Sequence, residues 1–558
     1  MLRLPRRRFR AHMEPGFVAM RDGVRLATRH LWPVGGDSTR GTILIRTPYG
    51  VQGPNSFMGI CGRLLAESGY HVVLQDVRGR YESEGRFEPF RNEKKDGRDT
   101  VEWILEQPWA AGRPIGLFGA SYLSYTAWCV LSEMPEHVGA IVSMIGCGDL
   151  YGVFYSGGGL SFQNTLEWGI SVGDREAVPP RTIDLERGWA HRPTREADRV
   201  ALRTVGWVRD WIDHPRQDAY WDELTAELPE KIPPVLSIAG LYDFFLQEQI
   251  AQYEKLIAKS NEGEAPSHRL IVGPWAHGVS AGWKWWRHGF SGLALREAIA
   301  HFDRHLSEGA EPTSDTRVRY FVPGQENWKT ADSWPPPSTE IQRLFLNAQD
   351  GKGQLCWEEP QAEAPSLHFD HDPNDPTPSI GGALFGWKAG VKDQRPLESR
   401  PDVLSYESAT LEKDLTLTGP IYVSLSVETN VEDIDLAVTL IDVLPNGRAE
   451  NVCHGLQRAR WRDLGRRETE PVFIEPGVVT RIQIDLGHAV RTFRKGHRLR
   501  LNISGSSFPL FDRNPACRVS PEKAKPSDFL KSRQVLHHGH EQRSWIDCLI
   551  QSDSSETS

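Results

Sequence analysis

The sequence predicts an α/β protein with a parallel sheet, a helical insertion and a C-terminal β domain. Between residues 41 and 147, short β-branched runs alternate with longer amphipathic segments, which is typical of a parallel sheet covered by helices on both faces. Residues 148–229 are rich in tryptophan and charge and have helical periodicity. From residue 313 onward, strands with alternating polarity follow one another between turn signals, which favours a β-sandwich or jelly roll.

The buried strands of the first part are expected at "TILIR", "HVVLQD", "IGLFG" and "AIVSMI" (42–46, 71–76, 115–119 and 140–145). The same pattern resumes at "PVLSIAG" and "HRLIVG" (234–240 and 268–273). We therefore predict an α/β domain over 1–147 and 230–312, a helical cap over the carboxyl edge of its sheet at 148–229, and a jelly-roll domain at 313–558. The last of these begins with the predicted strand "VRYFVPG".

Composition excludes several classes of protein. The chain has 558 residues, a net charge of -9 and 39% hydrophobic residues, as in a soluble globular protein with no nucleic-acid footprint. No apolar run is long enough to span a membrane. Arg6, Arg7, Arg8 and Arg10 precede no apolar segment, so we expect a solvated N-terminus and not a secretory signal.

Seven scattered cysteines without a C-x-x-C pair indicate neither a disulfide framework nor a zinc site. A cytoplasmic location fits them best. Three histidines in "LHHGHE" (536–541) lack a spaced acidic partner, so no metal and no other cofactor is expected. The oligomeric state stays open, a homodimer included.

Four chemically distinctive residues each follow a predicted strand. Tyr49, Ser121, Asp243 and His277 come after "ILIRTP", "IGLFG", "VLSIAGLY" and "LIVGPWA". In an open parallel sheet, function gathers at the carboxyl ends of strands. The order Ser, Asp, His is the one expected when a nucleophile on a strand–turn–helix is followed by its acid and its base.

The chemistry requires each residue type for a separate reason. A serine hydroxyl becomes an effective nucleophile when an imidazole removes its proton, the role expected for His277. A carboxylate at the other ring nitrogen, expected to be Asp243, fixes the tautomer and stabilises the imidazolium. The backbone N–H of Tyr122 and the hydroxyl of Tyr49 are the candidate donors to the substrate oxyanion.

Each of these residues also has a simpler interpretation. Ser121 could be a small residue at a helix start, and the G-x-S-x-G pattern is incomplete because Leu123 occupies its last position. Asp243 could cap the following helix, and Tyr49 could pack on its turn. Trp168 and Phe245 are candidate walls of a substrate pocket, although tryptophans in a cap also serve internal packing.

Phrases along nearly the whole chain resemble the cocaine esterase family of serine esterases and acylases, relatives of X-prolyl dipeptidyl peptidases and α-amino-acid ester hydrolases. The resemblance is carried by "RDGVRLATRHLWP", "IRTPYG", "VVLQDVRGRYESEGRFEPF", "GASYL", "GLYDFF", "GPWAHG" and "FRKGHRLRLNISGSSFPLFDRN". It implies an α/β-hydrolase domain, a helical cap and a jelly roll. It also implies Ser121, Asp243 and His277 as the triad, with Tyr49 and the Tyr122 amide as oxyanion hole.

One residue departs from the family pattern. Relatives usually place glycine three residues after the serine, where this chain has Ser124. Since Ser is small, we expect a local adjustment and no loss of activity.

The resulting hypothesis is a cofactor-independent serine hydrolase that cleaves a small-molecule ester or activated amide through an acyl-enzyme. Alternatives on the same scaffold are an X-prolyl dipeptidyl peptidase, a β-lactam or amide acylase, and an acyltransferase. A non-catalytic binding protein is the alternative outside enzymes.

Overall fold

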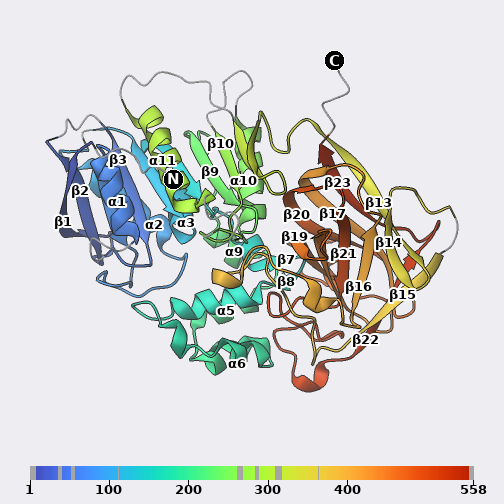
Figure 1. Cartoon of the computed structure of the whole chain (residues 1–558). Coiled ribbons are helices and arrows are strands. Elements are labelled where there is room, and N and C mark those ends of the chain that lie inside the picture. Colours follow the sequence, from blue (N-terminus) through green and yellow to red (C-terminus); the bar gives the residue numbers. More distant parts are fainter. Residues whose placement is uncertain are drawn as a thin grey trace, which may run out of the picture.

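The computed structural model describes residues 8–35, 40–51, 57–110, 112–260, 268–278, 280–282, 288–307, 317–361 and 364–551. Two large β sheets dominate it, one of ten strands and one of eleven. In Figure 1 the α/β part (blue to green) lies beside the β-rich part (yellow to red). Helices α5 (Phe162–Ser171) and α6 (Leu185–Ala190) lie below the junction of the two parts in that view.

The first sheet has the strand order β1-β2-β4-β3-β5-β6-β9-β10-β11-β12. Within this order, each neighbouring pair from β4 across the sheet to β11 is parallel. Strands β1, β2 and β12 pair antiparallel at the two edges. The strand bounds are Arg10–Ala19 (β1), Arg25–Val34 (β2), Thr42–Thr47 (β3), His71–Asp76 (β4), Ile115–Ala120 (β5), Val138–Met144 (β6), Val235–Gly240 (β9), Arg269–Gly273 (β10), Val318–Val322 (β11) and Asn327–Ala331 (β12).

Five helices pack on this sheet: α1 (Phe57–Glu67), α2 (Glu93–Leu105), α3 (Tyr122–Glu133), α10 (Leu246–Lys259) and α11 (Phe290–Leu306). Strands β3, β4 and β9 are buried at every position. Continuous apolar strands of this kind are expected where helices cover both faces of a parallel sheet. The expectation of an α/β core is therefore confirmed.

The edges of this sheet differ from the prediction. Strands β1 and β2 precede the first predicted strand, and β1 is exposed at most positions. Strand β11 was expected to open the C-terminal β domain, but it pairs with β10 in parallel and so belongs to the first sheet. The predicted boundary at 312 and 313 lies outside the described residues, as do Arg6 and Arg7, whereas Arg10 begins β1.

Six short α-helices and two 3-10 helices connect β6 to β9, the region where a helical insertion was predicted. Besides α5 and α6, the α-helices are α4 (Tyr151–Phe154), α7 (Ala197–Ala201), α8 (Gly206–Asp213) and α9 (Ala219–Leu224). A two-stranded hairpin of β7 (Tyr155–Ser156) and β8 (Gly159–Leu160) follows α4. Trp211 and Trp221 from this insertion are fully buried, so several of its tryptophans are internal packing.

The second sheet forms the β-rich part. Its order is β15-β22-β17-β23-β13-β14-β16-β21-β18-β19, with β20 paired to β17. The bounds are Thr339–Gln349 (β13), Lys352–Cys356 (β14), Ala364–His371 (β15), Val403–Ser408 (β16), Leu415–Thr429 (β17), Asp435–Val443 (β18), Ala449–Arg458 (β19), Thr480–Phe493 (β20), Arg498–Ser504 (β21), Ser532–His538 (β22) and Ser544–Gln551 (β23). Strand β19 contacts the β7–β8 hairpin, so the helical insertion lies against both sheets.

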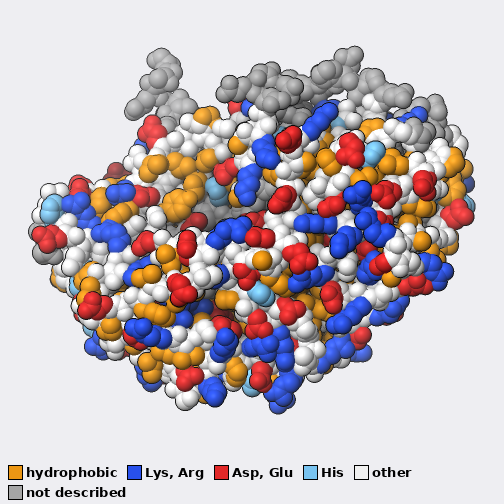
Figure 2. Space-filling view, turned by 180° about the vertical axis from the view of Figure 1, so that it is seen from behind, with side chains coloured by type: hydrophobic (Ala, Val, Ile, Leu, Met, Phe, Trp, Pro, Cys, Tyr) orange, Lys and Arg blue, Asp and Glu red, His pale blue; other side chains and the backbone are white. Residues whose placement is uncertain are grey.

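The surface carries both signs of charge. Figure 2 shows basic and acidic side chains interspersed over most of the face that it presents. Within the described part of the chain, no helix has the length and apolar character needed to cross a membrane.

Candidate active site

The carboxyl ends of neighbouring parallel strands bring four predicted site residues to one edge of the first sheet. Ser121 follows β5, Asp243 follows β9, His277 follows β10 and Tyr49 follows β3. Because β3, β5, β6, β9 and β10 are neighbours in the sheet, residues that lie far apart in the sequence meet there.

Ser121 sits on a strained turn between β5 and α3. Its φ of 59° and ψ of -127° are unusual for a residue with a side chain, and they project the hydroxyl beyond the sheet edge. Gly119 permits the turn, because a Cβ there would lie 2.1 Å from the backbone carbonyl carbon of Leu123. This geometry is that of a nucleophile elbow.

Ser121, His277 and Asp243 form a continuous hydrogen-bonded chain. His277 Nε2 lies 2.9 Å from Ser121 Oγ, and His277 Nδ1 lies 3.0 Å from Asp243 Oδ2. The Asp243 side chain is fully buried and that of His277 is 11% exposed. Asp243 also accepts a hydrogen bond from Phe245 N through Oδ1, 2.8 Å away, so its carboxylate is fixed by two partners.

The Tyr122 amide is available to an oxyanion. Tyr122 is the first residue of α3, and an N–H at that position has no intrahelical acceptor. The Tyr122 side chain points into the core, where its hydroxyl donates to Glu93 Oε1 and accepts from Phe90 N at 2.7 and 3.0 Å. These bonds hold the first turn of α3 beside Ser121.

The Tyr49 hydroxyl also lies at this site. It accepts a hydrogen bond from Trp168 Nε1 at 3.0 Å and interacts with Ser121. Tyr49 as a whole is 38% exposed, yet limited solvation of its hydroxyl raises the pKa of that group, a rise that hydrogen bonding with Trp168 and Ser121 opposes. The hydroxyl therefore stays protonated at neutral pH and retains its proton to donate.

Arg80 holds the turn that carries Tyr49. Its fully buried guanidinium donates to Pro48 O at 2.8 Å and to Val172 O, just beyond α5, at 3.1 Å. Arg80 thereby links the Tyr49 turn to the helix that carries Trp168. This role of Arg80 was not predicted from the sequence, although Arg80 lies within the phrase "VVLQDVRGRYESEGRFEPF" that carries the family resemblance.

Ser124, the departure from the family pattern, is fully buried beneath the elbow. Its Oγ lies 2.7 Å from Ser143 Oγ on β6. Ser143 Oγ also accepts from Trp128 Nε1 at 3.0 Å. The hydroxyl of Ser124 is thus part of a satisfied buried network.

A small, mainly aromatic pocket opens at Ser121. Trp168 from α5 and Phe245 before α10 both line it; their expected role as walls for a substrate stays a prediction. The other lining residues are Phe90, Tyr122, Tyr125, Leu150, Val153, Phe154, Asn164, Thr165, Phe244 and Phe385. None of these described residues is acidic or basic.

Phe244 and Phe385 are site residues that sequence reasoning missed. Phe244 stacks on His277 with ring centroids 4.4 Å apart, and Phe385 meets His277 edge-on at 5.2 Å. Phe385 comes from the β15–β16 connection of the β-rich part, and only tertiary structure brings it here. Phe244 is adjacent to Asp243 in the sequence and could have been found from that position.

No cluster of metal ligands occurs among the described residues. His538 from "LHHGHE" is buried and bonds the Tyr406 hydroxyl and Pro365 O at 2.9 and 2.8 Å. His537 lies 3.3 Å from Glu428. These two histidines serve the packing of the second sheet.

Two family models match the chain. Residues 22–279 match the X-Pro dipeptidyl-peptidase (S15 family), and residues 310–547 match the X-Pro dipeptidyl-peptidase C-terminal non-catalytic domain. Both matches agree with an α/β core followed by a separate β-rich region.

Curated relatives include the cocaine esterase of a Rhodococcus species, 32% identical over 95% of this chain and 96% of the relative. A putative serine esterase of Mycobacterium bovis is 26% identical over 90% of this chain and 91% of that relative.

Among solved structures, an aminopeptidase from a marine sediment Thaumarchaeota archaeon has a TM-score of 0.83 and 24% identity, and each chain is covered to 98%. An α-amino acid ester hydrolase has a TM-score of 0.82, 24% identity and 97% coverage of each chain. These two structures support the fold. Identity to the Rhodococcus esterase over nearly the whole length decides the family: the chain belongs to the cocaine esterase family and is a serine hydrolase of the esterase type.

Proposed function

We propose that this enzyme hydrolyses carboxylic esters, and activated amides, through an acyl-enzyme on Ser121. The observation that carries the proposal is the chain of hydrogen bonds from Ser121 Oγ through His277 to Asp243, with distances of 2.9 and 3.0 Å. Both distances lie within the range required for proton transfer.

In the first half-reaction, Ser121 Oγ attacks the carbonyl carbon while His277 Nε2 takes its proton. Asp243 accepts the Nδ1 proton and stabilises the imidazolium. The Tyr122 amide and the Tyr49 hydroxyl donate to the oxyanion. When the tetrahedral intermediate collapses, His277 returns the proton to the leaving alcohol and the acyl group stays on Ser121.

In the second half-reaction, His277 removes a proton from water, which attacks the acyl-enzyme carbonyl. The same two donors stabilise the second oxyanion. His277 then protonates Ser121 Oγ, and the carboxylic acid departs. No cofactor is needed at any step.

The pocket supports a neutral, apolar acyl group. Its described walls are aromatic and aliphatic apart from Asn164, Thr165 and the Ser121 hydroxyl. A substrate with a free α-amino group would bring an ammonium ion into this pocket, where no carboxylate among the lining residues would offset its desolvation. We therefore place simple and aryl esters above α-amino esters and X-prolyl amides as substrates.

We further propose that α4–α9 act as a cap, because Asn164, Thr165 and Trp168 from α5 line the pocket. The second sheet is proposed to be a jelly roll. A cytoplasmic location is proposed on the ground that all seven cysteines are free thiols, as in a reducing compartment.

The proposal is tested by Ser121→Ala with 4-nitrophenyl benzoate as substrate. We expect turnover to fall by at least about 10⁴-fold with unchanged thermal stability. A fluorophosphonate probe should add its mass to Ser121 in the wild type and not in the variant. Ester turnover that survives in a correctly folded Ser121→Ala protein would refute the assignment, and an unlabelled Ser121 would favour a binding protein.

A further inference from the structure

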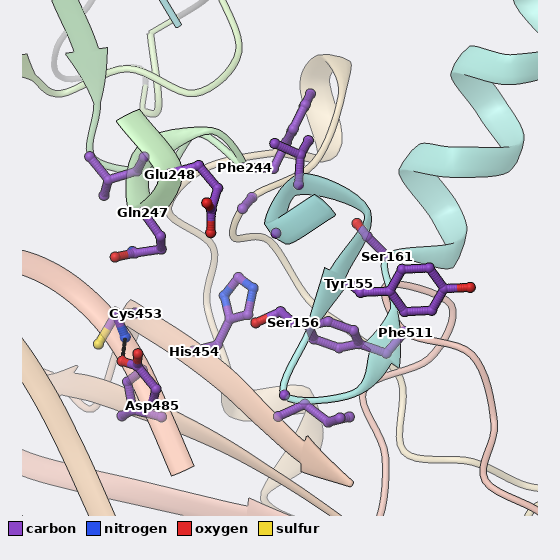
Figure 3. Close-up of a pocket in the computed structure, with 18 of the residues that line it drawn as sticks. Tyr155, Ser156, Ser161, Phe244, Gln247, Glu248, Cys453, His454, Asp485 and Phe511 are labelled. Carbon is purple, nitrogen blue, oxygen red and sulfur yellow. Dashed lines mark hydrogen bonds between the residues drawn. The ribbon is translucent and has the colours of Figure 1, made fainter. Parts of the chain in front are cut away.

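A second, larger cavity of about 400 Å³ lies between the α/β part and the β-rich part. The β7–β8 hairpin and the first turn of α10 form one side of it, and strands β19 and β20 form the other (Figure 3). Val153 and Phe244 line both this cavity and the pocket at Ser121. The two spaces are therefore neighbours, with Phe244 between them and stacked on His277.

His454 of β19 presents its imidazole to this cavity. In Figure 3 the ring points inward between Asp485 and Ser156. Surrounding protein lowers the His454 pKa to about 4, so at neutral pH the ring offers one donor and one acceptor. Among the described residues, the structure gives this ring no hydrogen-bond partner.

The position of His454 depends on a glycine. A Cβ at Gly382 would lie 2.4 Å from Cε1 and 2.6 Å from Nδ1 of the imidazole, and Gly382 has a φ of +85°. The backbone at Gly382 therefore leaves the space that the ring occupies.

Asp485 of β20 lines the same cavity. The side chain is exposed, yet protein around the carboxyl raises its pKa, as expected in a hollow. Oδ1 accepts from Gly487 N at 2.7 Å, so Oδ2 remains to accept from a ligand. Ser156 adds a hydroxyl on the opposite wall.

The remaining charges of the cavity are mostly paired. Glu248 bonds Arg466 at 2.5 Å, and Arg216 donates to the carbonyl of Glu468 at 2.6 Å. Asp243 is committed to His277. The cavity thus offers hydrogen-bonding groups without an excess of positive charge.

We propose that this cavity receives the alcohol half of the ester and selects alcohols that carry further hydroxyl groups. The inference rests on the proposed function, because His277 must protonate the departing alcohol and Phe244, which covers His277, faces the cavity. A hydroxylated alcohol would find partners in His454, Asp485 and Ser156, whereas the aromatic pocket would leave its hydroxyl groups unsatisfied. An apolar acyl group would instead be bound better by the aromatic pocket at Ser121 than by the polar cavity.

The test compares two benzoate esters with the same acyl group, 2,3-dihydroxypropyl benzoate and n-propyl benzoate. We expect kcat/KM to be at least tenfold higher for the dihydroxypropyl ester. His454→Ala and Asp485→Asn should each reduce this ratio at least threefold and leave kcat/KM for n-propyl benzoate within twofold of wild type. Asparagine at 485 keeps an oxygen for Gly487 N, so the local turn is retained.

His540→Ala is the matched control, since His540 is exposed and lies in the β22–β23 connection. It should leave the ratio unchanged. A wild-type ratio near one, or a ratio unaffected by both cavity variants, would overturn the inference while hydrolysis of both esters still supports the proposed function. Hydrolysis of either ester that persists in a correctly folded Ser121→Ala protein would instead contradict the proposed function.

A second readout uses acyl transfer from the benzoyl-enzyme. If the cavity binds alcohols, glycerol should intercept the benzoyl-enzyme more efficiently than n-propanol at equal concentration, by at least threefold. The advantage should disappear in His454→Ala. Equal interception by both alcohols in the wild type would contradict the inference.

Discussion

The indole Nε1 of Trp168 donates a hydrogen bond to the Tyr49 hydroxyl oxygen across 3.0 Å. Trp168 belongs to α5 and Tyr49 follows β3, so the bond joins the helical insertion to the sheet edge. With one lone pair engaged by the indole, the hydroxyl proton is directed elsewhere. Trp168 is thus a positioning residue for the proposed oxyanion donor as well as a pocket wall.

Removal of the Tyr49 hydroxyl should slow the chemical step. For Tyr49→Phe we expect kcat to fall about 10²- to 10³-fold with a small change in KM, because the lost donor acts on the oxyanion. Trp168→Phe should cost less than about tenfold in kcat, since the hydroxyl remains but is less well oriented. Steady-state hydrolysis of 4-nitrophenyl acetate measures both. Tyr422→Phe is the matched control, because Tyr422 is also 38% exposed. An equal fall in kcat in Tyr422→Phe would contradict the role of the Tyr49 hydroxyl as an oxyanion donor.

Phe385 should determine the preference for aryl acyl groups. Truncation in Phe385→Ala removes an edge contact to His277 and part of the pocket wall. We expect kcat/KM for 4-nitrophenyl benzoate to fall about tenfold and that for the acetate to change less, in line with an aromatic contact of about 1 kcal/mol plus lost apolar burial. Trp387→Ala, two residues away and 83% exposed, should change neither. An equal loss for both esters would indicate a general structural effect.

Ser124 should contribute to stability and not to catalysis. Ser124→Gly introduces the residue usual in relatives but removes the hydrogen bond to Ser143 and adds a helical glycine. We expect the free energy of unfolding, measured by urea titration, to be about 1–2 kcal/mol lower than in the wild type, and kcat to be retained. Ser132→Gly, near the end of the same helix, measures the cost of glycine at a less buried site. A large loss of kcat in Ser124→Gly would show that the elbow depends on this hydroxyl.

Buried histidines should make the protein less stable in acid. His30 Nε2 lies 3.0 Å from His71 Nδ1, and burial lowers the pKa of both, that of His30 to about 4. Between pH 6.5 and 4 the unfolded chain binds protons that the folded chain does not, so the free energy of unfolding should fall as pH falls through that window.

His30→Phe keeps an aromatic ring for the stack on Trp109, whose ring centroid lies 4.1 Å away, and removes one titrating group. Thermal melts from pH 7 to 4 should show a shallower decline than in the wild type. His540→Phe, at an exposed position, should follow the wild-type curve. Coincident declines for His30→Phe and the wild type would contradict the assignment.

The core of the sheet could be predicted because its strands are continuous apolar runs with a helix between each pair. Expected strands at 42–46 and 115–119 correspond to β3 and β5, and the residues after them meet as expected from the topology. Strand β1 gave no comparable signal, because most of its positions are exposed. The alternation in "VRYFV" fits either sheet, so only the pairing of β11 with β10 could assign it.

Within the site, the residues that follow strands could be located from local sequence, but the pocket around them could not. Phe385 reaches His277 from a connection more than a hundred residues further along the chain. The position of the His454 imidazole at the cavity, and its dependence on the absence of a side chain at Gly382, likewise arise from tertiary packing. Sequence periodicity contains no information on such contacts.

Strands β11 and β12 follow the α/β segment in the chain but complete its sheet. The N-terminal and C-terminal halves of the polypeptide therefore depend on each other for stability. A fragment ending at residue 307 would expose the backbone of β10 as a bare edge, which invites aggregation. Gln551 Nε2 also donates to the Tyr320 hydroxyl of β11 at 2.9 Å, and Thr492 N donates to Pro323 O at 2.8 Å. If the chain is cut between 307 and 317, the two pieces should therefore co-elute as one particle and separate only in denaturant.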